Sequence, residues 1–408
     1  MIRWLGLTDA QRKVTIDAAE QQSGITAKAI EKDWWVTLTL RALFQGAYHN
    51  SIVFKGGTSL SKGWNLIARF SEDIDIALDP QVFGVTYESN PSRGFVTKLK
   101  RLGCEFTSNE LRSDLEAQLA LIGVPAGMVQ VIANPVPENR PDTDPQTLLV
   151  RYPSLYDPNE YIADEVKVEV SVRSQLMPST TIQVQSFLDT YNPNPAFQEQ
   201  LFTVEIVLAH KTFLEKIFLL HEEFGKPERD NIRTERMSRH LYDLYKMMHT
   251  DILDTALGDH ALYDHLIEHR HQYNRITGID YHTHHHSIVS FIPIPEVLEE
   301  YRKDYRTMQE QMIYEEAADF DDIIADLKFL QGRIRMKMQP RSLTTIIETA
   351  VNQIGDEKKV AGAKVETPVV FTSDLSLPQS PLNANVIYSV KFIERNGHWQ
   401  FEAITIQK

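Results

Sequence analysis

Hydrophobic and polar residues follow two different periods along this chain. Near the start, apolar positions recur every three or four residues, which predicts amphipathic helices over 8–21 and 27–44. Short apolar or alternating runs between 52 and 78 predict strands, and the helical period dominates from about 202 to 330. Further helices are expected at 91–101, 108–121, 297–312 and 320–331, and further strands at 147–152 and 165–172. This order predicts an α+β fold, a mixed sheet flanked by helices and followed by a helical bundle.

A glycine turn follows the first expected strand. Gly56 and Gly57 let the backbone turn sharply and come close to a ligand without a Cβ in the way. Thr58 and Ser59 then open a helix that is expected to reach about Ala68, and its unpaired N–H groups attract phosphate oxygens. The turn predicts a phosphate site, although Gly-Gly-Thr-Ser alone is more often only a turn with a helix cap.

Two carboxylates lie one residue apart on the next expected strand. Asp73 and Asp75 share one face, opposite the isoleucines, because side chains alternate with a period of two. Carboxylates about 7 Å apart, from a rise of ~3.3 Å per residue, can share Mg²⁺ ions that hold a triphosphate and activate a hydroxyl. Asp-x-Asp alone is common on solvated strand edges. Its combination with the glycine turn predicts nucleotidyl transfer.

These motifs carry a family resemblance. Residues 56–62 and 69–75, with the upstream stretch at 30–37, resemble the AbiEii/AbiGii family of nucleotidyltransferase toxins, a branch of the DNA polymerase β-like superfamily. The resemblance implies a polymerase β-like core, NTP as co-substrate and Mg²⁺ or Mn²⁺ as cofactor. One departure is that Gly57-Thr58 replaces the superfamily's usual Gly-Ser.

The resemblance also implies a third carboxylate on a later strand. Residues 166–172 alternate best in the chain, with valines on one face and Lys167, Glu169 and Ser171 on the other. Glu169 is therefore the expected third metal ligand. A solvated glutamate on a half-exposed strand is the alternative.

A lysine on one helix and an aspartate on the next complete the family pattern. Residues 211–221 resemble the first helix and 238–245 the second, which favours Lys216 as a phosphate contact and Asp243 as the residue that orients it. Lys211 remains a rival for the lysine role. An ordinary interhelical ion pair is the alternative.

Composition is that of a soluble enzyme, with 42% apolar and 24% charged residues. A single cysteine, Cys104, forbids an internal disulfide and fits the cytoplasm, and no signal peptide or membrane span is expected. The net charge of −14 argues against a broad nucleic-acid-binding surface, but residues 296–326 alone hold eleven acidic and three basic side chains. Basic clusters at 98–101, 229–239 and 333–341 leave a local RNA contact open.

Three domains are expected: a nucleotidyltransferase core with N-terminal helices at 1–200, a helical domain that completes the active site at 201–338, and a C-terminal α/β extension at 339–408. In the extension, 343–354 reads as a helix, and Asn-Gly at 396–397 between two apolar runs predicts a β-hairpin. The family resemblance does not reach this extension, and its role is unknown.

Histidines raise a competing site. Eight of the fourteen lie between His260 and His286, including His265 and His269 at a helical spacing that zinc could use. Because no cysteine or clear glutamate motif accompanies them, a polar loop or a partner-contact surface is favoured over a zinc-dependent hydrolase.

We therefore expect an enzyme of the EC 2.7.7 type that transfers a nucleoside monophosphate from NTP to a hydroxyl of RNA, tRNA among the candidates, or of protein. The expected metal ligands are Asp73, Asp75 and Glu169, and the expected nucleotide contacts are Gly56, Gly57, Thr58, Ser59, Lys62, Ser71 and Lys216. The resemblance implies the toxin of a toxin–antitoxin or abortive-infection phage-defence pair, with a separately encoded antitoxin. A nucleotide-sensing or scaffold protein on the same fold is the alternative.

Overall fold

Two compact units make up the chain, residues 1–333 and 334–408. The protein is described by a computed structural model. The described residues are 2–157, 162–337, 364–370, 375–377, 380–382, 387–395 and 398–406. The expected helix at 343–354 lies outside them.

A seven-stranded mixed sheet forms the core of the first unit, in the order β3-β4-β5-β2-β1-β7-β6. The strands are β1 Ile52–Lys55, β2 Ile74–Leu78, β3 Gln130–Ala133, β4 Gln146–Arg151, β5 Glu165–Ser171, β6 Ser179–Val184 and β7 Phe202–Val207. The pairs β2 with β5 and β1 with β7 are parallel, and the remaining pairs are antiparallel. The predicted mixed sheet is confirmed.

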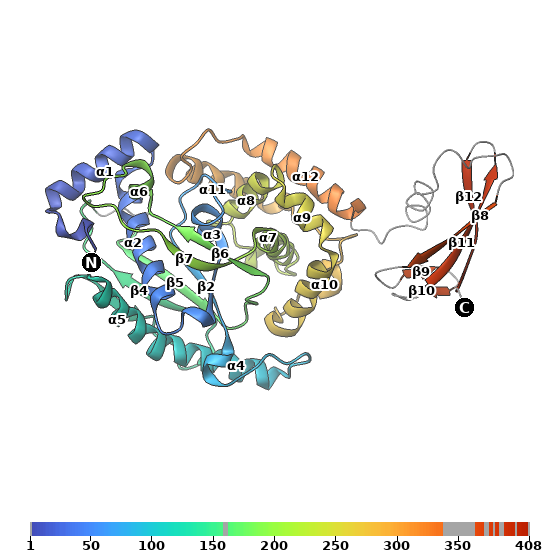
Figure 1. Cartoon of the computed structure of the whole chain (residues 1–408), viewed down its shortest axis with the longest axis horizontal. Coiled ribbons are helices and arrows are strands. Elements are labelled where there is room, and N and C mark those ends of the chain that lie inside the picture. Colours follow the sequence, from blue (N-terminus) through green and yellow to red (C-terminus); the bar gives the residue numbers. More distant parts are fainter. Residues whose placement is uncertain are drawn as a thin grey trace. The chain divides into compact units, whose positions relative to one another are not determined.

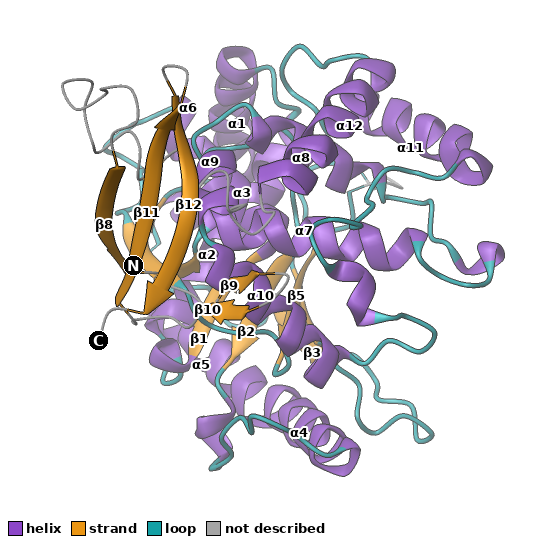
Figure 2. Ribbon diagram, turned by 90° about the vertical axis from the view of Figure 1, so that its right-hand side faces the viewer, coloured by secondary structure: helices purple, strands orange, loops and turns teal. Residues whose placement is uncertain are grey.

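Helices border this sheet (Figure 2). They are α1 Asp9–Ser23, α2 Ala27–Gln45, α3 Gly56–Lys62, α4 Arg93–Phe106, α5 Arg112–Ile122, α6 Phe187–Tyr191, α7 Ala209–Phe224, α8 Ser238–Met248, α9 Ile252–Gly258, α10 His260–His269, α11 Leu298–Gln311 and α12 Phe320–Lys337. Figure 1 shows the helices that follow the sheet in sequence, from α7 onward, gathered at one end of the first unit. No helix among the described residues is long and apolar enough to cross a membrane.

The helix after the glycine turn is shorter than predicted. It ends at Lys62 instead of near Ala68, and Asn65 adopts a φ of 52° that a continuing helix excludes. The chain therefore leaves the helix early, and this irregular stretch brings Arg69 toward the helical part of the unit.

Strand β7 begins a region that the sequence pattern assigned to helices. Phe202, Val204 and Ile206 are buried at alternating positions, and Ile206 pairs with Phe54 of β1. Its period of two is visible in the sequence, but the long helices that follow dominate the pattern. Residues on both sides of the expected domain boundary at 200 thus share one sheet.

Helix α2 buries three successive charged residues. Glu31, Lys32 and Asp33 are each no more than 3% exposed. Their hydrogen-bond and ion-pair partners are Ser154 and the Leu155 amide for Glu31, Glu72 for Lys32, and Lys62 and the Phe187 amide for Asp33. Lys32 also donates to the carbonyl of Ala163 at 3.0 Å, so one helical turn is joined to five separate segments of the unit.

The described part of the second unit consists of strands. β11 Ile387–Arg395 pairs antiparallel with β12 His398–Ile406 and with β8 Lys364–Val370. Arg395 pairs with His398, while the predicted Asn-Gly turn at 396–397 lies outside the described residues. The two short strands β9 Leu375–Leu377 and β10 Ser380–Leu382 also pair with each other.

Candidate active site

Strand β2 lies between two strands that align the site residue by residue. Asp75 is in register with Lys55 of β1 and with Glu169 of β5. Because paired residues of neighbouring strands point to the same face of a sheet, these three side chains share one face. Asp73 directly precedes β2 and interacts electrostatically with Glu169. The structure thus places Asp75 and Glu169 on one sheet face and Asp73 within electrostatic reach of Glu169.

The two aspartates carry negative charge that the protein compensates incompletely. Burial, and then the charges of Glu169 and Asp73, raise the pKa of Asp75 to about 6, although Lys55 opposes this shift. Burial and the neighbouring charge of Glu72 raise the pKa of Asp73. A divalent cation would relieve both effects, since it favours the ionised carboxylates. The donor set therefore fits Mg²⁺ or Mn²⁺.

Glu169 is engaged elsewhere on the sheet surface. Its carboxylate forms an ion pair with Lys167. Among the described residues, no three His, Cys, Asp or Glu side chains already form a group that could hold a metal ion. In a ligand role, Glu169 would share its carboxylate between Lys167 and the metal or exchange one for the other.

The glycine turn packs directly against the carboxylate strand. Gly56 has a φ of +77°, and a Cβ on it would lie 2.0 Å from Oδ2 of Asp75. A Cβ on Gly57 would lie 2.7 Å from Nη2 of Arg69 and 3.0 Å from Oγ of Ser71. Gly56 therefore combines a backbone conformation that favours glycine with a close approach to Asp75, while a side chain at position 57 would displace the guanidinium of Arg69.

The hydroxyl groups of the turn fix its shape. Thr58 is fully buried, and its hydroxyl donates to the carbonyl of Asp73 and lies 2.9 Å from the hydroxyl of Ser71. The hydroxyl of Ser59 donates to the carbonyl of Gly56 at 2.8 Å. Thr58 and Ser59 were expected to contact the nucleotide or to cap the turn. Their hydrogen bonds in the structure stabilise the turn.

Lys62 points into the protein core. Its ammonium lies 2.5 Å from Oδ1 of Asp33 and 5.1 Å from the ring centre of Phe187. Both partners of the ion pair are almost fully buried. The structure therefore makes Lys62 a support behind the turn, in place of the triphosphate contact expected from sequence.

Asp243 joins the two halves of the site. Its carboxylate accepts hydrogen bonds from Nε and Nη2 of Arg69 at 2.7 and 2.8 Å, and Nζ of Lys216 lies 2.8 Å from Oδ2. Although burial alone would raise it, these two cations hold the pKa of Asp243 well below its usual range. Asp243 is fully buried, although a charged residue on a helix is usually exposed. Arg69 had no predicted role, although it directly precedes the carboxylate motif.

The rival lysine, Lys211, belongs to a different ion pair. Its ammonium lies 3.0 Å from Glu215 and donates to the carbonyl of Gln175 at 2.9 Å. Burial lowers the pKa of Lys211, while the charges of Lys211 and Lys55 hold the pKa of Glu215 at about 2. Among the described residues, Lys211 makes no ion pair with the carboxylates of β2.

Glu72 completes the set of charges around the site. Lys32 lies 2.6 Å from one of its oxygens and Arg236 2.8 Å from the other. These cations lower the pKa of Glu72 despite its burial. Glu72 is thus a structural carboxylate whose charge is neutralised by two cations of the protein. No local sequence signal distinguishes it from a metal ligand.

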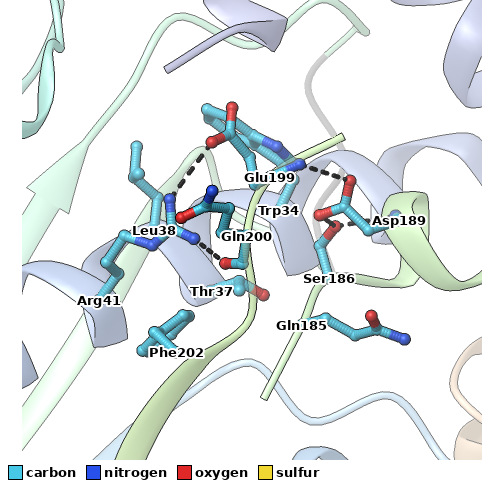
Figure 3. A pocket seen from close by; sticks show the side chains of 10 residues that line it. All are labelled: Trp34, Thr37, Leu38, Arg41, Gln185, Ser186, Asp189, Glu199, Gln200 and Phe202. Carbon is cyan, nitrogen blue, oxygen red and sulfur yellow. Dashed lines mark hydrogen bonds and ion pairs between the residues drawn. The ribbon is translucent and has the colours of Figure 1, made fainter. Parts of the chain in front are cut away.

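A small pocket lies apart from the carboxylates, beside α2 (Figure 3). It is lined by Trp34, Thr37, Leu38, Arg41, Gln185, Ser186, Asp189, Glu199, Gln200 and Phe202. Its polar groups are satisfied by one another, with Arg41 lying 3.2 Å from Glu199 and Ser186 donating to Asp189 at 2.8 Å. We assign no ligand to this pocket.

Four histidines of the region 260–286 take part in side-chain hydrogen bonds: His265, His269, His284 and His285. His284 is fully buried and lies 3.1 Å from Glu222, which also pairs with Arg270. His269 hydrogen-bonds the carbonyl of Arg173 at 2.6 Å. The described residues hold no histidine cluster of metal-binding form.

A mixed sheet with a glycine turn set against an Asp-x-Asp strand has the arrangement of a nucleotidyltransferase fold. Residues 39–326 match the family described as "Nucleotidyl transferase AbiEii toxin, Type IV TA system". The chain therefore belongs to the AbiEii nucleotidyltransferase toxin family, as its motifs predicted.

Two further comparisons add little. No curated protein matches the chain. The crystal structure of JHP933 from Helicobacter pylori is similar over 81% of this chain and 99% of that chain, with 13% identity and a TM-score of 0.39.

Proposed function

We propose that this protein is a divalent-metal-dependent nucleotidyltransferase that transfers a nucleoside monophosphate from NTP to a hydroxyl of RNA or protein in the cytoplasm. The observation that carries the proposal is the position of Asp73 and Asp75, two incompletely compensated carboxylates against which the Gly56 turn packs. Its biological role is that of a type IV toxin with a separately encoded antitoxin, in abortive-infection phage defence.

Asp73, Asp75 and Glu169 would hold Mg²⁺ or Mn²⁺. When bound, the metal supplies positive charge that neutralises the triphosphate and lowers the pKa of the attacking hydroxyl. The raised pKa values of both aspartates support this assignment, because a site built for protein cations alone would show lowered values, as Glu72 and Asp243 do.

The reaction forms one bond and breaks one. The acceptor oxygen attacks the α-phosphorus, the bond to the bridging oxygen breaks, and pyrophosphate leaves. The proton of the acceptor hydroxyl passes to a carboxylate, for which Glu169 is the candidate because it faces the site from the neighbouring strand.

Lys216 is the proposed phosphate contact from the helical half. An ammonium has three donors, of which one reaches Asp243, and Nδ1 of His240 lies 3.4 Å away. Asp243 keeps the lysine oriented and fixes Arg69 at the glycine turn at the same time. Ser71 stands at the same turn as a secondary contact.

Labelling identifies donor and acceptor together. The purified chain is incubated with Mg²⁺, each α-labelled NTP in turn, and total cellular RNA, with tRNA as a separate fraction, or total protein. We expect one macromolecular fraction to be labelled by the wild-type protein and not by Asp75→Asn. Binding of NTP without any transfer would support the nucleotide-sensing alternative, and absence of both would overturn the proposal.

A further inference from the structure

Six cations around the carboxylates already have an anionic partner within hydrogen-bond distance. These pairs are Lys32 with Glu72, Arg236 with Glu72, Lys62 with Asp33, Arg69 with Asp243, Lys211 with Glu215 and Lys216 with Asp243. Their N to O distances lie between 2.5 and 3.0 Å. Each of these cations is therefore neutralised by a carboxylate of the protein, and of the six only Lys216 is proposed to contact phosphate as well.

Arg239 differs from all of them. Its closest carboxylate oxygen is Oδ2 of Asp73, at 4.0 Å from Nη1. No described residue accepts a hydrogen bond from its Nε, which is nevertheless buried. The side chain remains 34% exposed, so its other nitrogens can be reached from solvent. We would expect a structural ion pair between Arg239 and Asp73 to have an N to O distance like those of the other pairs, 2.5 to 3.0 Å. The observed distance is longer, at 4.0 Å.

The direction of Arg239 is set by helix α8. Arg239 and Asp243 are four residues apart, so they share one helix face. Asp243 binds Arg69, and the guanidinium of Arg69 lies against Gly57. The face that carries Arg239 therefore looks onto the glycine turn and Asp73, where the proposed nucleotide sits.

We infer that Arg239 binds the β- and γ-phosphates of the NTP, the part that leaves as pyrophosphate. This inference deepens the proposed function and rests on it. A guanidinium presents a planar set of donors that matches two phosphate oxygens, and these phosphates carry most of the negative charge of an NTP. Arg239 is partly exposed and lies 4.0 Å from Asp73, so its guanidinium can reach phosphates that a metal ion holds at the carboxylates. It would stabilise charge that grows on the leaving group.

The test is equilibrium binding of pyrophosphate, NTP and NMP in the presence of Mg²⁺ to the full chain and its variants. Arg239→Met should weaken binding of pyrophosphate and NTP by about 10- to 100-fold, the range of a charged hydrogen bond, and change NMP binding less than about 3-fold. Arg239→Lys should recover part of the loss. Lys246→Met is the matched control on the same helix, because Lys246 pairs with Glu315 outside the site.

Three results would overturn the inference. If the wild type binds and transfers while Arg239→Met binds pyrophosphate equally well, Arg239 has no phosphate role and the proposed function survives. If Arg239→Met lowers the melting temperature by several degrees without changing pyrophosphate affinity, the residue is a structural counter-ion of Asp73. If the wild type itself binds neither NTP nor pyrophosphate, the proposed function and this inference fail together.

Discussion

Glu72 and Asp73 are adjacent in the chain but lie in opposite electrostatic surroundings. Glu72 is held between Lys32 and Arg236 at 2.6 and 2.8 Å, and its pKa is lowered. Asp73 has its nearest cation at 4.0 Å, and its pKa is raised. The fold therefore neutralises one carboxylate and leaves the next one available to a ligand.

Removing the charge of Asp75, whose pKa is raised like that of Asp73, should affect stability differently from removing the charge of Glu72. Asp75→Asn should abolish transfer and leave the free energy of unfolding unchanged or raised by up to about 1 kcal/mol, because a partly buried, repelled carboxylate is lost. Glu72→Gln should lower that free energy by about 3 kcal/mol, since the ammonium of Lys32 stays buried without its partner. Denaturant unfolding of both variants measures the difference. Equal destabilisation would contradict our assignment of the charges.

The glycine turn should not tolerate a methyl group. Gly56→Ala should lose transfer, because its Cβ would meet Asp75 at 2.0 Å. Gly127→Ala is the matched control, with the same φ of +77° and no atom within 4 Å. Both variants should carry a backbone strain of about 1 to 2 kcal/mol, but only Gly56→Ala should lose activity. Full activity of Gly56→Ala would show that the turn can move away from the carboxylate.

The two lysines of α7 should separate function from structure. Lys216→Ala should reduce NTP affinity and transfer by more than about 100-fold, and Asp243→Asn should reduce transfer similarly because it leaves Lys216 without orientation. Lys211→Ala should affect mainly stability, since Lys211 pairs with Glu215. Rates and NTP affinities of the three variants decide between them. An inactive Lys211→Ala beside an active Lys216→Ala would mean that the two lysine roles are exchanged.

Mild acid should destabilise the protein partly through His269. Burial lowers the pKa of His269 to about 4, against about 6.5 when unfolded, so the unfolded state binds more protons between these values. The contribution is full above pH 6.5 and is lost as the pH falls toward 4. His269→Gln should reduce the drop in unfolding free energy between pH 7 and 5 by about 1 to 2 kcal/mol. The exposed His282 provides the control His282→Gln, which should keep the wild-type slope.

Local patterns were sufficient for the centre of the fold. The turn at Gly56 depends on the backbone freedom of glycine, and the strand that carries Asp75 depends on an alternation with a period of two. Both signals can be recognised within a few residues of sequence. The parallel strand β7 was missed because six residues of alternation precede sixteen residues of clear helix. The early end of α3 was missed because it depends on a distant contact, the hydrogen bonds of Arg69 with Asp243.

Ion-pair partners were beyond the reach of sequence patterns. Lys62 finds Asp33 at a separation of 29 residues, and Arg69 finds Asp243 at 174. Which of many charged residues meet is decided by packing, and their burial reverses the expectation that charged runs face solvent. The sequence likewise could not predict that Arg239 has no carboxylate closer than 4.0 Å among the described residues.

The 174-residue separation of Arg69 and Asp243 also orders events during synthesis. Residues that supply the glycine turn and the Asp-x-Asp strand leave the ribosome first, while the aspartate that fixes Arg69 and Lys216 is translated much later. A nascent chain that ends before α8 therefore lacks the groups that close the site. An interrupted translation product of this protein therefore carries the Asp-x-Asp strand without Asp243, so its Arg69 lacks the carboxylate that fixes it in the full chain.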